Sequence, residues 1–291
     1  METTDILKKV RKIEIKTRGL SRHIFSGQYH SAFKGKGMAF SEVREYQYGD
    51  DIRDIDWNVT ARFNHPYVKI FEEERELTVM LLIDVSGSNA FGTLSKLKED
   101  QMTEIAAVLA FSAINNNDKV GVIFFSDKIE KFIPPKKGSK HILRIIRELI
   151  DFKTESHRTN ISVALQYLTN AIKKRCTVFV ISDFMDPGFE TALNIAGNKH
   201  DLVALRVYDH RETELVNVGM VKMLDNETGD QVWIDTARKS IREAYRKWWL
   251  NSDRQITTLF NKTRTDYTNI ATDQDYVKPL IKLFKQREAR K

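Results

Sequence analysis

The sequence is poor in cysteine and lacks long hydrophobic runs. Its single cysteine, Cys176, excludes an intrachain disulfide and begins an apolar run, in which we expect a buried, unreactive thiol. No stretch approaches the roughly 20 consecutive apolar residues of a membrane-spanning helix. The first residues, METTDILKKVRK, lack the apolar block of a secretory signal. We therefore expect a cytoplasmic protein without a membrane span.

The sequence also lacks the motifs of common hydrolases and nucleotide-binding proteins. Gly-x-Ser-x-Gly is absent, and none of the seven histidines lies in a recognisable partner motif for a nucleophilic serine. The glycine-rich FKGKGMAF (33–40) follows no predicted strand and lacks the Gly-Lys-Ser of a phosphate-binding loop, so it predicts a turn. These absences favour a binding protein over an enzyme.

The positive charge is local. The chain has 47 Lys+Arg and 40 Asp+Glu, but 14 and 6 of these lie from residue 237 onward, so the rest of the chain is close to neutral. A basic C-terminal region can bind phosphate or an acidic protein surface, although a solvated helix face explains it as well. Nucleic-acid binding therefore stays an alternative, and we do not expect it.

Apolar runs that resemble strands alternate with amphipathic stretches that resemble helices, which predicts an α/β fold with a doubly wound, mostly parallel sheet. The predicted strands are 77–84, 119–127, 177–183 and 201–209. The predicted helices between them are 95–115, 139–152, 160–174 and 189–199. All four predicted strands end in aspartate.

One connection is too short for a crossover helix. The run 119–127 is followed at once by 128–135, which predicts an antiparallel edge strand closed by Pro134 and Pro135. Further on, 219–235 predicts another hairpin, and helices are expected over 237–262 and 273–291. We expect three parts: an N-terminal extension (1–76), the α/β core (77–210), and a C-terminal hairpin with basic helices packed on the core (211–291).

A candidate site lies where the first core strand ends, in LLIDVSGS (81–88). Ligands of open α/β sheets bind at the carboxyl ends of strands, and alternate positions let Asp84, Ser86 and Ser88 converge on one point. Other strand ends offer Thr159 and Asp183, although each could instead cap a helix or form a turn. Carboxylate and hydroxyl oxygens suit Mg²⁺, or Mn²⁺, better than zinc.

These five residues resemble the metal-ion-dependent adhesion site of the von Willebrand factor A domain, in which Asp-x-Ser-x-Ser is followed by a distant Thr and a distant Asp. Asp84, Ser86, Ser88, Thr159 and Asp183 match in that order. The resemblance implies a von Willebrand factor A-like fold, a bound Mg²⁺, and completion of the metal shell by a partner's carboxylate.

The segment 37–62 sharpens the resemblance. Its pattern, G-x-x-F-x-x-V-R-E-Y-x-x-G-D-D-x-R-x-I-D-W-x-x-x-A-R, is similar to the signature of a bacterial family of uncharacterised von Willebrand factor A-like proteins, the domain of unknown function numbered fifty-eight. That family is often associated with MoxR-type AAA+ ATPases, which implies such an ATPase as partner. Either an ion-paired scaffold or a partner surface explains this segment, and its candidate partner-binding residues are Arg44, Asp50, Asp51, Arg53, Asp56, Trp57 and Arg62.

We therefore expect a non-enzymatic, Mg²⁺-dependent adaptor that grips an acidic residue of a partner and works with the ATPase as a chaperone or remodelling module. The enzymatic alternative is a Mg²⁺-dependent phosphatase or hydrolase that uses Asp84, since an aspartate at a strand end near Mg²⁺ suits phosphoryl transfer. Such enzymes usually carry a second acid two residues later, where this chain has Ser86.

Overall fold

The computed structural model describes residues 39–72, 77–87, 97–224 and 229–290. These residues belong to two compact units, one within residues 34–77 and one that holds the described residues from Thr78 onward. The two units are described separately.

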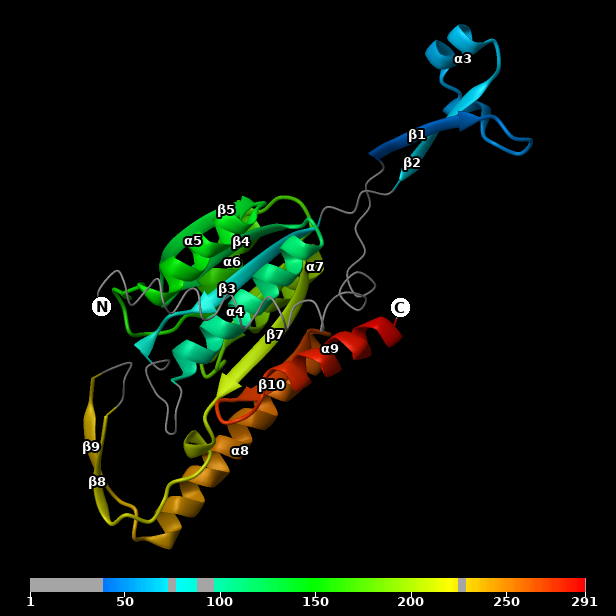
Figure 1. Ribbon diagram of the computed structural model, residues 1–291. Coiled ribbons are helices and arrows are strands. Elements are labelled where there is room, and N and C mark those ends of the chain that lie inside the picture. The colour runs from blue at the N-terminus through cyan, green and yellow to red at the C-terminus, as the bar shows by residue number, and fades with distance from the viewer. Residues whose placement is uncertain (1–38, 73–76, 88–96, 225–228, 291) are drawn as a thin grey trace. The chain divides into compact units, whose positions relative to one another are not determined.

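The larger unit is built on a six-stranded sheet with the strand order β10-β7-β6-β3-β4-β5 (Figure 1). Its strands are β3 (Thr78–Asp84), β4 (Lys119–Phe125), β5 (Ile129–Lys136), β6 (Thr177–Ser182), β7 (Asp201–Tyr208) and β10 (Asp266–Ala271). Neighbours pair in parallel except β4 and β5, which are antiparallel. The predicted mostly parallel sheet with one antiparallel edge strand is confirmed. Pro134 and Pro135 lie in that edge strand, where a missing amide hydrogen is tolerated.

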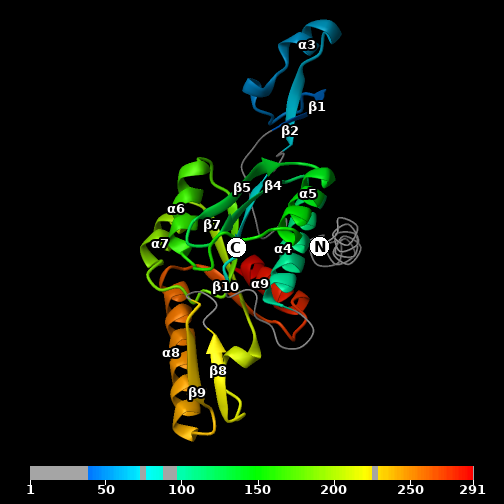
Figure 2. The same ribbon diagram turned by 90° about the vertical axis from the view of Figure 1, so that its left-hand side faces the viewer.

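Helices cover both faces of this sheet (Figure 2). The helices α4 (Lys98–Asn115) and α5 (Ser139–Ile150) pack together on one face, and α6 (Ile161–Ala171) and α7 (Glu190–Lys199) pack together on the other. Side chains of β6 alternate between the two cores: Val178 and Val180 lie in the cluster with α6 and α7, whereas the ring of Phe179 lies 6.3 Å from that of Phe284. Burial on both faces explains the unbroken apolar runs of the central strands.

The C-terminal region adds a strand that the sequence analysis missed. β10 pairs with β7 along its length, although its sequence, DYTNIA, is too polar to stand out as a buried strand. An edge position explains this composition, because only its last two residues are buried. The following helix α9 (Val277–Ala289) holds it through Arg287, whose guanidinium binds Asp266 of β10 and Asp201 of β7.

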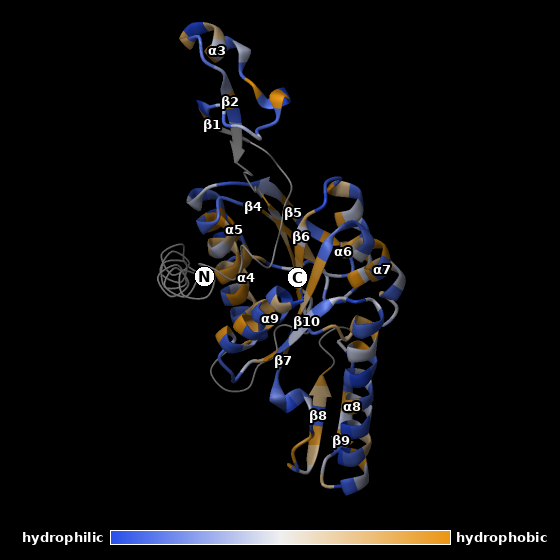
Figure 3. Cartoon of the chain, turned by 90° about the vertical axis from the view of Figure 1, so that its right-hand side faces the viewer, coloured by the Kyte–Doolittle hydropathy of each residue, from blue (hydrophilic) through white to orange (hydrophobic). Residues whose placement is uncertain are grey.

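The predicted hairpin is present as β8 (Met220–Leu224) and β9 (Gln231–Asp235), followed by the long helix α8 (Lys239–Lys262). The large apolar side chains of α8 are buried in its C-terminal half, where Ile256 and Phe260 enter the core. In its N-terminal half Trp248 remains 53% exposed, so only part of the helix packs on the core. The hairpin also carries hydrophobic colour in Figure 3, and Met220 and Trp233 are exposed.

The smaller unit is a two-stranded antiparallel ribbon with short helices between its strands. β1 (Ala39–Glu45) pairs with β2 (Tyr67–Glu72), and the connection carries the 3-10 helix η1 (Ile52–Asp54) and the helix α3 (Trp57–Phe63). Asp51 caps η1 and Asp56 caps α3, each by accepting backbone amide hydrogens. The aspartates of the signature segment therefore shape its turns.

Candidate functional site

The candidate site lies at the carboxyl edge of the sheet, where β3 and β6 end side by side. Asp84 is the last residue of β3 and Asp183 directly follows β6. The two strands are parallel neighbours with Ile83 opposite Ile181, so their ends bring the two aspartates together. Asp84 is 2% exposed and Asp183 5%.

The carboxylate of Asp84 accepts hydrogen bonds from its own turn and from the end of β6. Its Oδ1 accepts from the backbone N of Ser86 at 3.0 Å, and its Oδ2 accepts from the hydroxyl of Ser182 at 2.7 Å. Burial, followed by the negative charge of Asp183, raises the pKa of Asp84 to about 6, against the lowering effect of its hydrogen bonds with both serines. The site is therefore one in which additional positive charge would be stabilising.

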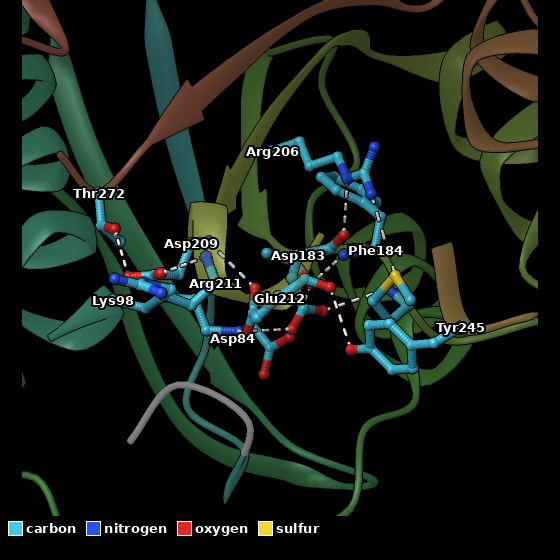
Figure 4. A network of polar contacts seen from close by, with 12 residues as sticks. Asp84, Lys98, Asp183, Phe184, Arg206, Asp209, Arg211, Glu212, Tyr245 and Thr272 are labelled. Atoms are coloured by element: carbon cyan, nitrogen blue, oxygen red, sulfur yellow. Dashed lines mark hydrogen bonds and ion pairs between the residues drawn. The ribbon is translucent and has the colours of Figure 1, made fainter. Parts of the chain in front are cut away.

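Asp183 takes part in a buried ion-pair network with Lys98, the first residue of α4 (Figure 4). The ammonium Nζ of Lys98 lies 3.0 Å from Oδ2 of Asp183 and 2.6 Å from Oε1 of Glu212. Burial works to lower the pKa of Lys98, but the charges of Asp183 and Glu212 outweigh it and raise that pKa. Lys98 is thus a charged lysine inside the candidate site.

The loop that carries Thr159 lies against the turn after β3. The backbone N of Gly87 donates to the carbonyl of His157 at 2.9 Å, and Asn160 N donates to Ser126 O at the end of β4. Thr159 is half-buried in this loop. The structure therefore brings Asp84, Ser86 and Asp183 together and holds the Thr159 loop beside them, while Ser88 lies outside the described residues.

A cavity of about 130 Å³ opens beside Asp84. It is lined by the turn Asp84 to Gly87, by α4, and by the loop of Phe152, Thr154 and His157. The lining joins apolar side chains, such as Met102 and Leu149, to polar ones that include Asp84, Ser86 and Glu99. An entering side chain would therefore meet carboxylate and hydroxyl oxygens among apolar groups.

Three contributing residues were missed from the sequence. Ser182 is the last residue of β6 and could have been found from that place, because the end of β6 lies beside the end of β3, where Asp84 stands. Lys98 and Glu212 carried no signal, because Lys98 lies among other charged residues and Glu212 is in a short 3-10 helix, η3 (His210–Glu212). Only the tertiary fold brings these two side chains to Asp183.

The predicted partner-binding residues all lie in the smaller unit, where most contact one another. Arg44 binds Asp50 through two hydrogen bonds, of 2.9 and 2.7 Å, and Arg53 binds Asp51 at 2.8 Å. Asp56 caps α3 and lies 3.6 Å from the ammonium of Lys69. Trp57 is 67% exposed and Arg62 is exposed as well. The segment contains ion pairs, and α3 carries the exposed residues Trp57 and Arg62.

The donor set at the sheet edge fits a hard divalent cation. Asp84, Ser86, Ser182 and Asp183 carry carboxylate and hydroxyl oxygens and are all buried at adjacent strand ends, and the charge of Asp183 raises the pKa of Asp84. Within the described residues, the candidate site included, no group of three or more His, Cys, Asp or Glu side chains could hold a metal ion, so the site depends on serine and threonine hydroxyls beside its two aspartates. The dense carboxylates of the smaller unit therefore give no competing acidic metal cluster within that part of the chain.

The single cysteine is a poor nucleophile. Burial raises the pKa of Cys176 to about 12, so its thiol stays protonated at neutral pH. Burial lowers the pKa of His200 to about 4, and this histidine lies beside Cys176, with Sγ and Nδ1 3.3 Å apart. His157 is exposed, and its backbone carbonyl accepts from Gly87. Cys176 and His200 therefore resemble a buried structural pair more than a catalytic one.

Comparison with known proteins gives a family and a fold. A family model described as "Protein of unknown function DUF58" matches residues 42–255. The uncharacterised protein Rv1480 of Mycobacterium tuberculosis is 26% identical over 283 residues, which is 96% of this chain and 88% of its own length. YeaD of Bacillus subtilis is 21% identical over 200 residues, 69% of this chain and 46% of its own.

Among solved structures, an aerotolerance-related membrane protein from Bacteroides fragilis aligns with a TM-score of 0.50 at 16% identity, over 74% of this chain and all of its own. The von Willebrand factor A domain of SpRpn10 aligns with a TM-score of 0.41 at 11% identity, over 73% and 95%. Together with the strand order, the alignment with the Bacteroides fragilis protein confirms the predicted α/β fold with a mostly parallel sheet.

The prediction of a cytoplasmic location is wrong. It rested on the absence of a long apolar run, whereas similar folds belong to proteins described as membrane proteins, such as that of Bacteroides fragilis. The apolar content of one domain reports how that domain folds and leaves its compartment open. Within the described residues, no helix is both long and apolar enough to cross a bilayer.

Proposed function

The chain belongs to the DUF58 family, and from this premise we propose that it is a non-enzymatic, Mg²⁺-dependent module that binds an acidic residue of a partner protein. The observation that supports this most is the pair of buried carboxylates, Asp84 and Asp183, at adjacent strand ends with serine oxygens beside them. Mn²⁺ is the alternative ion, since it accepts the same oxygen donors.

In this proposal the ion is held by Asp84, Ser86, Ser88, Thr159 and Asp183. A bound Mg²⁺ supplies a coordination position that a carboxylate of another protein can enter. The protein's own residues orient and enclose the site. The backbone of Ser86 and the hydroxyl of Ser182 orient the Asp84 carboxylate, and the apolar side chains that line the neighbouring cavity would exclude water from an entering side chain. Such a contact adds direction to a modest interface.

We infer the kind of partner from the signature segment 37–62, which resembles that of proteins associated with MoxR-type AAA+ ATPases. The proposed partner is such an ATPase, with the chain acting as an adaptor in chaperone or remodelling work. The smaller unit offers a further contact, because Tyr48, Ile52, Trp57 and Phe63 are all at least 61% exposed. Arg62 lies on the same helix as Trp57.

Calorimetry with a purified MoxR-type ATPase tests this function. We expect binding in Mg²⁺ that weakens at least tenfold in chelator or in the isosteric Asp84→Asn variant, because both remove the ionic contact. The matched control is Asp151→Asn, the same change at an exposed aspartate after α5, which should bind as the unaltered chain does. Equal affinity in Mg²⁺, in chelator and in Asp84→Asn would reject the metal-mediated mechanism.

Binding of the ATPase does not by itself exclude hydrolysis, so a separate assay addresses the enzymatic alternative. We expect no turnover of generic phosphate esters in Mg²⁺ or Mn²⁺ by the unaltered chain. Turnover that is lost in Asp84→Asn and retained in Asp151→Asn would replace the adaptor proposal with a phosphatase.

A further inference from the structure

Lys98 stands at a position that helix formation does not favour. It is the first residue of α4, and a positive charge at a helix N-terminus opposes the helix dipole. It is also fully buried, and burying an ammonium is costly unless it is paired. Both costs are offset by its contacts with Asp183 and Glu212. The ion pairs of the site, rather than the stability of the helix, therefore explain why a lysine stands at this position.

The contacts of Lys98 overlap those expected of a metal ion. Its ammonium lies 3.0 Å from Oδ2 of Asp183, while Oδ1 of the same carboxylate accepts from the backbone N of Met185 at 3.2 Å. An ion that uses Asp183 therefore meets the charge of Lys98 at the same carboxylate. Two cations at one carboxylate repel each other, and in a buried site this repulsion is weakly screened.

Glu212 gives the ammonium a second place to bind. Lys98 is closer to Glu212, at 2.6 Å, than to Asp183. Glu212 itself is fixed, because its Oε2 accepts from the backbone N of Asp209 at 3.0 Å and its carbonyl accepts from Tyr245 of α8 at 3.0 Å. The ammonium can thus leave Asp183 and remain paired with Glu212, so a divalent ion can replace it at Asp183 without leaving a buried lysine unpaired.

We propose that Lys98 is an internal competitor of the divalent ion: its ammonium neutralises Asp183 when no ion is bound, shifts onto Glu212 when one is bound, and so weakens ion binding. This inference rests on the proposed metal-dependent function. It assigns Lys98 as a positioning and affinity-setting residue of the site, and Glu212 as the acceptor that receives it.

The test is calorimetric titration of the full chain, stripped with chelator at pH 8, with Mg²⁺ and with Mn²⁺. We expect Lys98→Met, which keeps the length and removes the charge, to bind on the order of tenfold more tightly than the unaltered chain or better. Lys98→Arg keeps the charge and should stay within about threefold of it.

The matched control is Arg206→Met, which also removes a buried positive charge near Asp183. Arg206 donates to the backbone carbonyl of Asp183 at 3.1 Å and pairs with Asp253, so it does not compete for the Asp183 carboxylate. If Arg206→Met raised the affinity for the divalent ion as much as Lys98→Met does, a general effect of charge would explain the gain, and direct competition would be overturned.

The outcomes separate this inference from the proposed function. Measurable binding by the unaltered chain that is equal or weaker in Lys98→Met overturns competition and leaves the metal function standing. Binding by Lys98→Met alone supports competition and removes the metal function from the unaltered chain. Binding by neither overturns both.

Lys98→Met leaves the buried carboxylate of Asp183 and the half-buried carboxylate of Glu212 without their lysine, so its folding is measured as well. The readout is the rise in melting temperature that saturating Mg²⁺ produces, followed by circular dichroism. Competition predicts a larger rise in Lys98→Met than in the unaltered chain, including recovery of folding by Mg²⁺ alone. An equal or smaller rise, or a failure to fold with and without Mg²⁺ while Lys98→Arg folds normally, counts against it.

Discussion

Replacing Ser182 with alanine removes the hydroxyl that connects Asp84 to the turn after β6. Ser182 is fully buried; its hydroxyl donates to Oδ2 of Asp84 at 2.7 Å and accepts from the backbone N of Phe184 at 3.1 Å. A hydrogen bond to a charged group contributes about 1.5 to 3 kcal/mol, and a buried amide without a partner costs about 1 to 3 kcal/mol. Phe184 has a φ of 58°, and the hydrogen bond from its backbone N to the Ser182 hydroxyl helps to hold this conformation. Since the two effects share one hydroxyl and do not simply add, we expect a loss of about 2 to 5 kcal/mol.

Urea unfolding at pH 8, followed by far-ultraviolet circular dichroism, measures this loss. The matched control is Ser112→Ala in α4. Ser112 is also fully buried, but within the described part of the chain its hydroxyl has no hydrogen-bond partner. Removing an unsatisfied buried hydroxyl should leave stability unchanged or raise it by up to about 1 kcal/mol. Both variants lose one oxygen atom from the core, so packing changes are comparable.

A second readout separates orientation of Asp84 from stability. The hydrogen bond from Ser182 lowers the pKa of Asp84, so Ser182→Ala should raise that pKa further, whereas Ser112→Ala should not. Equal shifts of the urea midpoint in the two variants would refute the reasoning, because they would show that the Ser182 hydroxyl contributes no more than an unpaired one.

Three further predictions concern the core and its edges, and urea midpoints check each. Gly121→Ala would place a Cβ 2.9 Å from the backbone N of Pro135 on β5, so we expect the free energy of unfolding to fall by roughly 2 kcal/mol or more. An unchanged midpoint would mean that the edge strand moves away to make room for the Cβ. Burial holds the pKa of His200 near 4, below its usual 6.5, so the stability it contributes is present above pH 6.5 and is lost as pH falls toward 4. Between pH 7 and pH 5 the unaltered chain should lose about 2 kcal/mol more than His200→Gln, and parallel losses would contradict this. Arg287→Met leaves the aspartates of β7 and β10 without their buried guanidinium, and we expect a loss of about 2 to 4 kcal/mol, whereas a loss below about 0.5 kcal/mol would show that α9 holds β10 by apolar packing alone.

The central sheet could be predicted because its strands must be apolar on both faces. The runs ending at Asp84, Phe125 and Ser182 carry this requirement in their composition, and the short link before β5 leaves room only for a hairpin. The strand β10 could not be predicted in the same way, because an edge strand is partly solvated and its polar residues follow no apolar pattern. The compartment was mispredicted, because a folded domain's composition does not encode where it is attached.

The candidate site also has a part that the sequence determines and a part that only the tertiary structure determines. The sequence by itself determined which residues stand at strand ends, and so it placed Asp84 and Asp183 at one edge of the sheet. That β3 and β6 are neighbours, which brings the two aspartates together, was decided by the tertiary structure. Only the tertiary structure decided what surrounds them: Lys98 from a helix N-terminus, Glu212 from a short 3-10 helix, and the Asp183 carboxylate between Lys98 and a backbone amide. The physical reason is that strand ends follow from local hydrophobic patterns, whereas a buried ion pair between residues 85 and 114 positions apart depends on packing that no local pattern records.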